Sequence, residues 1–194
     1  PVRELIAGMG EGVKYGAISD SKIFDILTED LTALLAMKRM DLIEDLVLRS
    51  CRIKSEIVSR DETDSGVRRI LNFGHTFAHA VENAVHYSGI LHGEAVLIGM
   101  KAAAWLSQHV GSFSREEGRR LVNLIDKFPV EVEHESITTA ALWEAISLDK
   151  KVIDGEIYFV LLKKFGEPEI RSDIPARDVE QAMEFMWNAS GNFT

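Results

Sequence analysis

Apolar positions recur at helical spacing along most of this chain. Leu5, Ile6, Met9 and Val13 lie three or four residues apart, and segment 41–59 continues the same pattern. Because an α-helix turns once every 3.6 residues, such spacing places the apolar side chains on one face. The pattern predicts helices over residues 2–15, from Ser21 to about residue 27, and over 41–59, 75–87, 92–110, 114–128, 138–148 and 175–186.

Strand signals are confined to the C-terminal part. Residues 156–162 form a short apolar run next to a glycine, and residues 168–171 can pair with them as a hairpin. The polar segment 61–66 reads as a loop. A glycine-rich stretch at 8–12 follows no strand, so it does not match a dinucleotide-binding fingerprint. We therefore expect one mostly α domain over residues 1–194, with a small β-hairpin.

Composition narrows the classes of partner. The net charge of −9 argues against nucleic-acid binding, which needs a basic surface. No apolar run approaches the roughly 20 residues of a membrane span, so we expect no membrane insertion. The single cysteine, Cys51, excludes an internal disulfide and fits the reducing cytoplasm. We expect Cys51 to be buried as a small apolar residue.

Three histidines provide the candidate chemistry. His75 and His79 are four residues apart and would share one helix face, while His92 begins the next helical pattern just before Gly93. Such a set could bind a metal, transfer protons, or do both. A carboxylate would complete a metal site, and the spacing alone does not select among Glu11, Glu82 and Glu94.

Cations lie close to the same features. Arginine offers a planar fork for carboxylate or phosphate, and lysine offers a mobile point charge. Asn72 carries a side-chain amide within an apolar run, so we expect it to be hydrogen-bonded. The cations concerned are Lys14, Lys54, Arg68, Arg69, Lys150 and Lys151.

Together these segments resemble the C-terminal half of the 3-dehydroquinate synthases over nearly the whole chain. The resemblance implies a multi-helical domain that carries a metal site and much of the substrate site. It also implies a preceding α/β domain that binds NAD and is absent from these 194 residues. The motifs are Glu11 to Gly16, the loop 61–66 before Arg68, Leu71 to Glu82, His92 to Val96, and Asp149-Lys150-Lys151.

The resemblance implies a role for each matching residue. The metal ligands would be Glu11, His75 and His92, whereas His79 would contact substrate and take part in proton transfer. Asp64 stands where the family usually has glutamate, at an acid–base position, and Gly10 and Gly12 replace the usual alanine and valine around the metal glutamate. The substrate carboxylate would bind Lys54 and Arg68, the pocket would include Asn72 and Lys14, and the phosphate would bind Lys150 or Lys151.

The implied reaction converts 3-deoxy-D-arabino-heptulosonate 7-phosphate to 3-dehydroquinate and phosphate, in the shikimate pathway of aromatic amino acid biosynthesis. It uses NAD catalytically together with a divalent metal, zinc or cobalt. The full-length protein would be a homodimer, and the 194 residues alone are expected to be inactive. The alternatives are a sedoheptulose 7-phosphate-type cyclase, a metal-dependent polyol dehydrogenase, and a helical module that binds a metal or a partner without catalysis.

Overall fold

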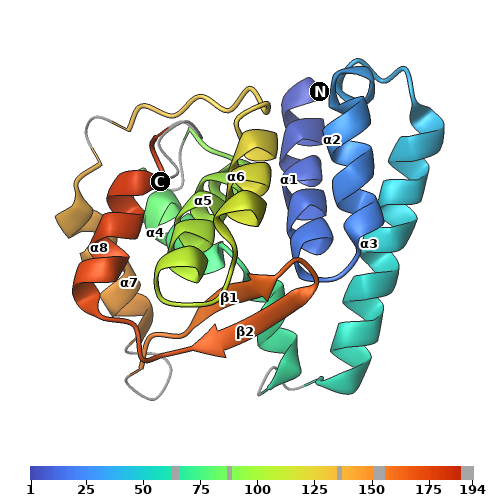
Figure 1. The fold of residues 1–194 in the computed structure, drawn as a ribbon. Coiled ribbons are helices and arrows are strands. Elements are labelled where there is room, and N and C mark those ends of the chain that lie inside the picture. Colours follow the sequence, from blue (N-terminus) through green and yellow to red (C-terminus); the bar gives the residue numbers. More distant parts are fainter. Residues whose placement is uncertain (63–65, 87–88, 135–136, 151–155, 189–194) are drawn as a thin grey trace.

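The computed structural model describes residues 1–62, 66–86, 89–134, 137–150 and 156–188 (Figure 1). Most of the described residues are helical, and the only sheet among them is a two-stranded hairpin, as the sequence predicted. The elements in chain order are α1 (Val2–Ile18), α2 (Ser21–Leu35), α3 (Met40–Arg60), the 3-10 helix η1 (Val67–Asn72), α4 (His75–Ala84), α5 (His92–His109), α6 (Arg115–Ile125), α7 (Thr139–Lys150), β1 (Phe159–Lys164), β2 (Glu167–Arg171) and α8 (Ala176–Phe185).

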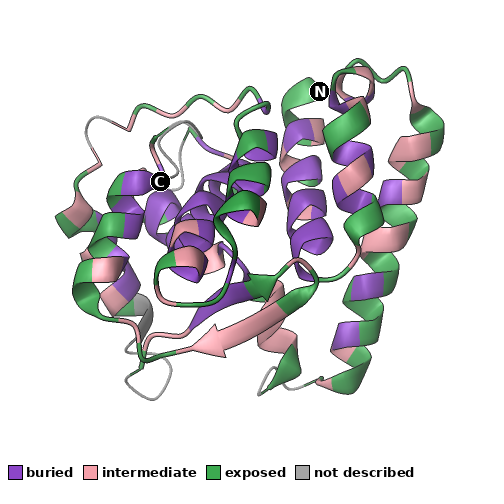
Figure 2. Ribbon diagram, in the orientation of Figure 1, coloured by how far each residue is buried: buried purple, intermediate pink, exposed green. Residues whose placement is uncertain are grey.

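Helix α5 is the centre of the fold. It is buried along almost its whole length and contacts α1, α4, α6, α8 and β1 (Figure 2). Helices α1, α2 and α3 lie side by side at one end of the molecule, and the hairpin runs beneath α5 (Figure 1). The alanine-rich sequence of α5 suits this position, because small side chains let several neighbours approach at once.

None of the helices that the structure describes is long and apolar enough to cross a membrane.

Several helix boundaries follow local hydrogen bonds. Asp20 is the N-cap of α2, and its carboxylate accepts the Lys22 N–H at 2.9 Å. Ser114 is the N-cap of α6, since its hydroxyl oxygen accepts the Glu117 N–H at 3.2 Å. Helix α4 ends at Ala84, earlier than expected, and His86 beyond it adopts a positive φ of 53°.

Two elements differ from the sequence prediction. Strand β1 begins at Phe159 rather than 156, because the Tyr158 carbonyl accepts the Thr76 hydroxyl at 3.2 Å instead of joining the ladder. The 3-10 helix η1 was not predicted, because a run of six residues is too short to show a helical period. The strands pair antiparallel, with Phe159 opposite Arg171.

Glycines let α5 cross its neighbours without side chains between the backbones. A Cβ atom on Gly93 of α5 would lie 1.9 Å from the Ala7 carbonyl oxygen of α1. A Cβ on Gly99, further along α5, would lie 2.1 Å from the carbonyl oxygen of Gly74, just before α4. Real Cβ atoms are never that close to an oxygen, so both crossings require glycine. The crossings bring the first turns of α4 and α5 against the middle of α1.

We predict that Gly99→Ala destabilises the fold by about 1–3 kcal/mol or more, because α4 and α5 must separate to admit the methyl group. Gly8→Ala, at an exposed position of α1, is the matched control, since a Cβ atom there would have nothing within 4 Å. That change should be neutral or stabilise by up to about 1 kcal/mol through helix propensity. Urea denaturation followed by circular dichroism measures both, and equal effects would contradict the crossing argument.

Candidate metal and substrate site

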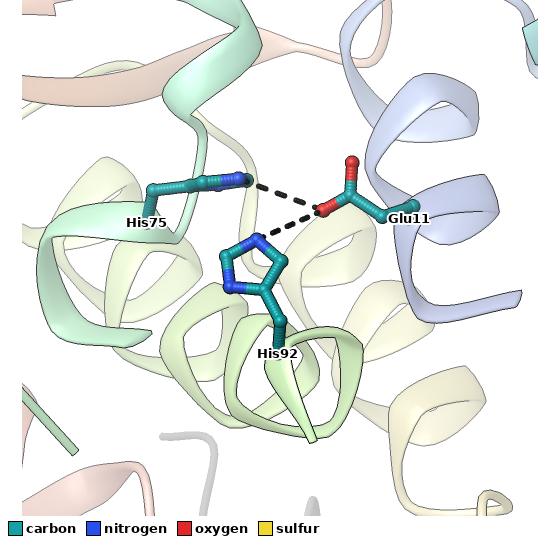
Figure 3. A group of neighbouring side chains, drawn as sticks. All are labelled: Glu11, His75 and His92. Carbon is teal, nitrogen blue, oxygen red and sulfur yellow. Dashed lines mark ion pairs between the residues drawn. The ribbon is translucent and has the colours of Figure 1, made fainter. Parts of the chain in front are cut away.

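Three side chains from three helices converge where α1, α4 and α5 meet (Figure 3). Glu11 comes from the middle of α1, and His75 and His92 are the first residues of α4 and α5. The Nε2 atoms of His75 and His92 lie 3.5 Å and 3.8 Å from the same oxygen, Glu11 Oε1. All three ligand-capable atoms lie within 4.8 Å of one another. The two imidazole ring centroids are 5.1 Å apart.

The two oxygens of the Glu11 carboxylate have different surroundings. Oε2 accepts a hydrogen bond from the Lys14 ammonium, one helical turn along α1. Oε1 is buried and has no hydrogen-bond partner among the described residues. A buried carboxylate oxygen without a partner is costly unless a cation or donor occupies the space beside it. The arrangement therefore leaves one oxygen available for a positive ion.

Lys14 is buried beside this carboxylate, with 3% of its surface exposed. Burial lowers the pKa of its ammonium, the Glu11 charge opposes that shift, and the charge of Lys54 lowers the pKa further. The Lys14 ammonium also lies 4.7 Å from the centroid of the Tyr15 ring. Lys54, exposed on α3, is thus near enough to the site to affect its electrostatics.

His75 is held in a neutral form suited to ligation. Its Nδ1 lies 3.2 Å from the Phe73 carbonyl oxygen, so an Nδ1–H donates there and Nε2 keeps its lone pair facing Glu11. Burial lowers the pKa of His75 to about 4, and the positive charge of Lys14 acts in the same direction. The ring is therefore uncharged at neutral pH. His92 likewise has an acceptor at Nδ1, the Glu82 carboxylate at 3.0 Å.

The spacing of these atoms fits a tetrahedral zinc site. Nitrogen and oxygen ligands lie about 2.0–2.1 Å from zinc, which puts two tetrahedral ligand atoms about 3.4 Å apart. The measured separations of 3.5 Å and 3.8 Å are close to that value. Two imidazoles and one carboxylate would leave a fourth position for water or substrate. The donor set thus fits a catalytic divalent metal.

His79 borders this group without joining it. Its ring centroid is 5.8 Å from that of His75 and 6.0 Å from that of His92. A second cluster of metal-capable groups consists of His79, Glu82 and His92, so the two histidines four residues apart fall in different clusters. Among the described residues the geometry therefore does not favour the His75–His79 chelate that the sequence spacing left open.

Comparison with known proteins identifies the family. The family model described as 3-dehydroquinate synthase C-terminal matches residues 8–152. The chain belongs to the 3-dehydroquinate synthase family. Its expected resemblance is thereby confirmed over most of its length.

Curated relatives support this assignment. The 3-dehydroquinate synthase of Nitrosococcus oceani is 46% identical over 166 residues, which cover 85% of this chain and 46% of the relative. The enzyme of Thermodesulfovibrio yellowstonii is 38% identical over 184 residues, which cover 94% of this chain and 51% of the relative. The chain therefore spans about half the length of the curated relatives it matches.

Solved structures show the same fold in related cyclases. ValA, a 2-epi-5-epi-valiolone synthase from Streptomyces hygroscopicus subsp. jinggangensis 5008 with NAD⁺ and Zn²⁺ bound, superposes with a TM-score of 0.86 at 25% identity; the match covers 96% of this chain and 52% of ValA. A 2-deoxy-scyllo-inosose synthase complexed with carbaglucose-6-phosphate, NAD⁺ and Co²⁺ gives a TM-score of 0.68 at 18% identity, over 94% of this chain and 51% of that one. The second likeness concerns the fold alone.

The expected substrate residues that the structure describes differ in exposure. Arg68 is half-buried in η1, and its guanidinium donates to the Glu62 carbonyl oxygen at 3.0 Å. The Asp61 carboxylate shapes this loop by accepting the N–H groups of Gly66 at 2.8 Å and Arg68 at 3.0 Å. Asn72 is exposed at the end of η1. That its side-chain amide is hydrogen-bonded stays a prediction.

Three of the expected residues fall partly or wholly outside the described part of the chain. Asp64 and Lys151 lie outside the described residues, and Lys150 ends α7 with its side chain outside them as well. Of the alternative carboxylates, Glu94 is paired with Arg3 through two hydrogen bonds of 2.7 Å and caps α5 by accepting the Leu91 N–H at 2.8 Å. Glu94 is therefore engaged away from the imidazoles.

An apolar cleft lies on the other side of α1. It has a volume of about 240 Å³ and lies between α1, α2 and α3, with Glu11 in its wall. Cys51 also lines it and is exposed, so the prediction that this cysteine is buried was wrong. Helix α3 buries only a narrow stripe, which leaves the Cys51 side of the helix open.

We predict a strong coupling between Glu11 and Lys14 in the metal-free protein. Lys14→Met should cost about 2 kcal/mol, because it removes the partner of a largely buried carboxylate. The loss of unfolding free energy in the double variant Glu11→Gln/Lys14→Met should be smaller than the sum of the losses in the two single variants, by about 1–3 kcal/mol. Urea denaturation with a chelator present measures the double variant and both single variants.

The exposed pair Arg39 and Asp41 provides the matched control, with its guanidinium nitrogen 2.8 Å from the carboxylate. Its coupling should be much weaker than that of Glu11 and Lys14, because water screens exposed ion pairs. A coupling for Glu11 and Lys14 no larger than this one would contradict the buried-pair account.

Proposed function

We propose that this chain is the metal- and substrate-binding part of a 3-dehydroquinate synthase. The complete enzyme converts 3-deoxy-D-arabino-heptulosonate 7-phosphate to 3-dehydroquinate and phosphate, as a carbon–oxygen lyase. The observation that carries the proposal is the buried Glu11 Oε1, without a hydrogen-bond partner among the described residues and faced by two imidazole Nε2 atoms. Family membership supplies the reaction class.

In this proposal, zinc or cobalt binds Glu11, His75 and His92. The metal would polarise a substrate hydroxyl and the carbonyl formed from it. Lys14 balances the charge of the ligand carboxylate and orients it by holding Oε2, so that Oε1 faces the histidines. Burial and the charge of Lys14 keep His75 neutral, and the Phe73 carbonyl holds the proton on Nδ1, so the lone pair on Nε2 stays available to the metal.

The remaining side chains bind and orient the substrate. Arg68 and the nearby Lys54 hold the carboxylate, and Asn72 lines the same pocket. His79 borders the metal site without being a ligand, so it can accept a proton from the bound substrate or donate one to it. Fixing both ends of the substrate supplies part of the rate through orientation. The sequence assigns the phosphate end to Lys150 or Lys151 and an acid–base role to Asp64.

NAD would bind an α/β domain outside these 194 residues. The half-length match to relatives and the NAD⁺ in the ValA structure support this part of the proposal. The full-length protein would act as a homodimer. The sedoheptulose 7-phosphate-type cyclase remains the second candidate, while the 46% identity to a 3-dehydroquinate synthase favours the acid substrate.

We predict that His75→Ala and His79→Ala differ in metal content. His75→Ala should weaken zinc binding more than about 100-fold, because loss of a ligand exceeds the effect of losing an outer hydrogen bond. His79→Ala should change zinc affinity by less than about tenfold and still abolish turnover in the full-length enzyme. Zinc titration and elemental analysis measure both variants. Equal metal loss in the two variants would instead support a His75–His79 chelate.

We predict that Arg68→Ala in the full-length enzyme raises KM and lowers kcat/KM more than tenfold, which corresponds to about 1.4 kcal/mol or more. The physical reason is loss of the bidentate partner of the substrate carboxylate. Phosphate release measures the rate. Arg69→Ala is the control, because the Arg69 guanidinium is stacked 4.7 Å from the centroid of the Tyr158 ring.

Two outcomes would count against the acid substrate. One is unchanged kinetics in Arg68→Ala, and the other is preferential turnover of sedoheptulose 7-phosphate by the wild-type enzyme. Net accumulation of NADH with an alcohol substrate would instead support a polyol dehydrogenase. The 194-residue chain alone should release no phosphate until an NAD-binding domain is supplied.

A further inference from the structure

Glu82 is a buried carboxylate that the proposed reaction does not use. It lies on α4 with 8% of its surface exposed, and its Oε1 is 3.0 Å from His92 Nδ1 on α5. Buried glutamates are rare unless they are paired, because burial removes their hydration. The contact with His92 is therefore the feature that explains a charged group at this position.

The two histidine ligands differ in how firmly their surroundings hold them. The His75 side chain is only 11% exposed, so packing restricts its ring, and a backbone carbonyl accepts its Nδ1–H. The His92 side chain is 48% exposed, so packing restricts its ring much less. For His92 the hydrogen bond to Glu82 therefore matters more for holding the ring in place.

This contact also selects the protonation site of the ring. A carboxylate at Nδ1 requires a proton on that nitrogen, which leaves the lone pair on Nε2. Nε2 lies at the opposite end of the ring from Nδ1 and is 3.8 Å from Glu11 Oε1. The His92 ring thus has its lone-pair nitrogen, Nε2, on the side of Glu11 and His75.

We infer that Glu82 is a positioning residue, which fixes the His92 imidazole in the Nδ1–H tautomer and directs Nε2 to the metal shared with Glu11 and His75. This inference rests on the proposed metal site. Partners of this kind orient metal-bound histidines and raise their basicity, and their loss typically costs 10- to 100-fold in metal affinity.

The cluster of His79, Glu82 and His92 allows a competing arrangement, in which Glu82 is itself a ligand of a second cation. That arrangement would use His92 Nδ1 for the second ion while Nε2 serves the first. One neutral imidazole cannot supply a lone pair at both nitrogens. A hydrogen bond from Nδ1–H to Glu82 is compatible with ligation through Nε2, so the positioning role is favoured.

The test compares Glu82→Met with Glu82→Gln. Methionine removes the acceptor, and an apolar group of similar size in place of a buried charge is usually tolerated by the fold. Glutamine keeps an acceptor oxygen in the same place. We expect Glu82→Met to bind zinc 10- to 100-fold more weakly and Glu82→Gln less than tenfold more weakly, in competition with a chromophoric chelator.

The second readout is the tautomer of His92 in the metal-free protein, from nitrogen-15 NMR at about pH 8. The wild-type protein should show the Nδ1–H form, and Glu82→Met should shift toward Nε2–H. Glu94→Gln is the control, because buried Glu94 pairs with Arg3 instead and should leave the His92 tautomer unchanged.

Each outcome decides the question. Wild-type zinc affinity and an unchanged tautomer in folded Glu82→Met would overturn the positioning role, as would two zinc ions per wild-type chain falling to one in that variant. If Glu82→Met does not fold, Glu82→Asp, which withdraws the carboxylate by one carbon, is measured in the same way. Absence of zinc binding by the wild-type chain would refute the metal site, while the tautomer would still test the Glu82 contact.

Discussion

The close crossing of α5 with α1 and α4 is the constraint on which the rest of the structure depends. Gly93 brings the α5 backbone against the Ala7 carbonyl, and Gly99 brings it against the backbone at Gly74. Helices usually pack with axes 8–10 Å apart, and the near end of that range needs small residues at the contact. Because these crossings lie beside the first turns of α4 and α5, His75 and His92 face α1 over a gap that one ion can bridge. The Arg3–Glu94 pair secures the beginning of α1 to the same turn of α5.

The site keeps polar groups that a purely structural core would replace. Lys14 and Glu82 are both buried, and Glu11 holds one oxygen without a partner among the described residues. A fold selected for stability alone would gain by exchanging such groups for apolar ones. Each of these contacts leaves one ligand atom facing the same point. Lys14 holds one oxygen of the Glu11 carboxylate, and the Nδ1 atoms of the two histidines have acceptors. The other carboxylate oxygen and the two Nε2 atoms therefore converge. Pre-ordering of this kind reduces the reorganisation needed when a metal binds.

The sequence predicted the fold class well and the site in part. Helical periodicity identified the helices because their apolar faces are long, whereas η1 and the start of β1 depend on contacts that no local pattern encodes. Spacing could not choose among Glu11, Glu82 and Glu94, because that choice depends on how α1 crosses α5. Family resemblance pointed to Glu11, which the structure places beside the two Nε2 atoms. The sequence could have indicated Glu82 as the partner of His92. Glu82 follows His79 by one helical turn, on the face of α4 that meets α5.

With the proposed divalent metal bound, the charges around Glu11 would give the site a sign opposite to that of the chain. The dication and the Lys14 ammonium, set against the carboxylates of Glu11 and Glu82, would leave one net positive charge. Lys54 and Arg68 make the surroundings more positive, although the chain as a whole carries −9. An anionic sugar phosphate would thus be repelled by most of the surface and attracted at one place. The acidic exterior would then discourage anions from binding anywhere but at the metal site.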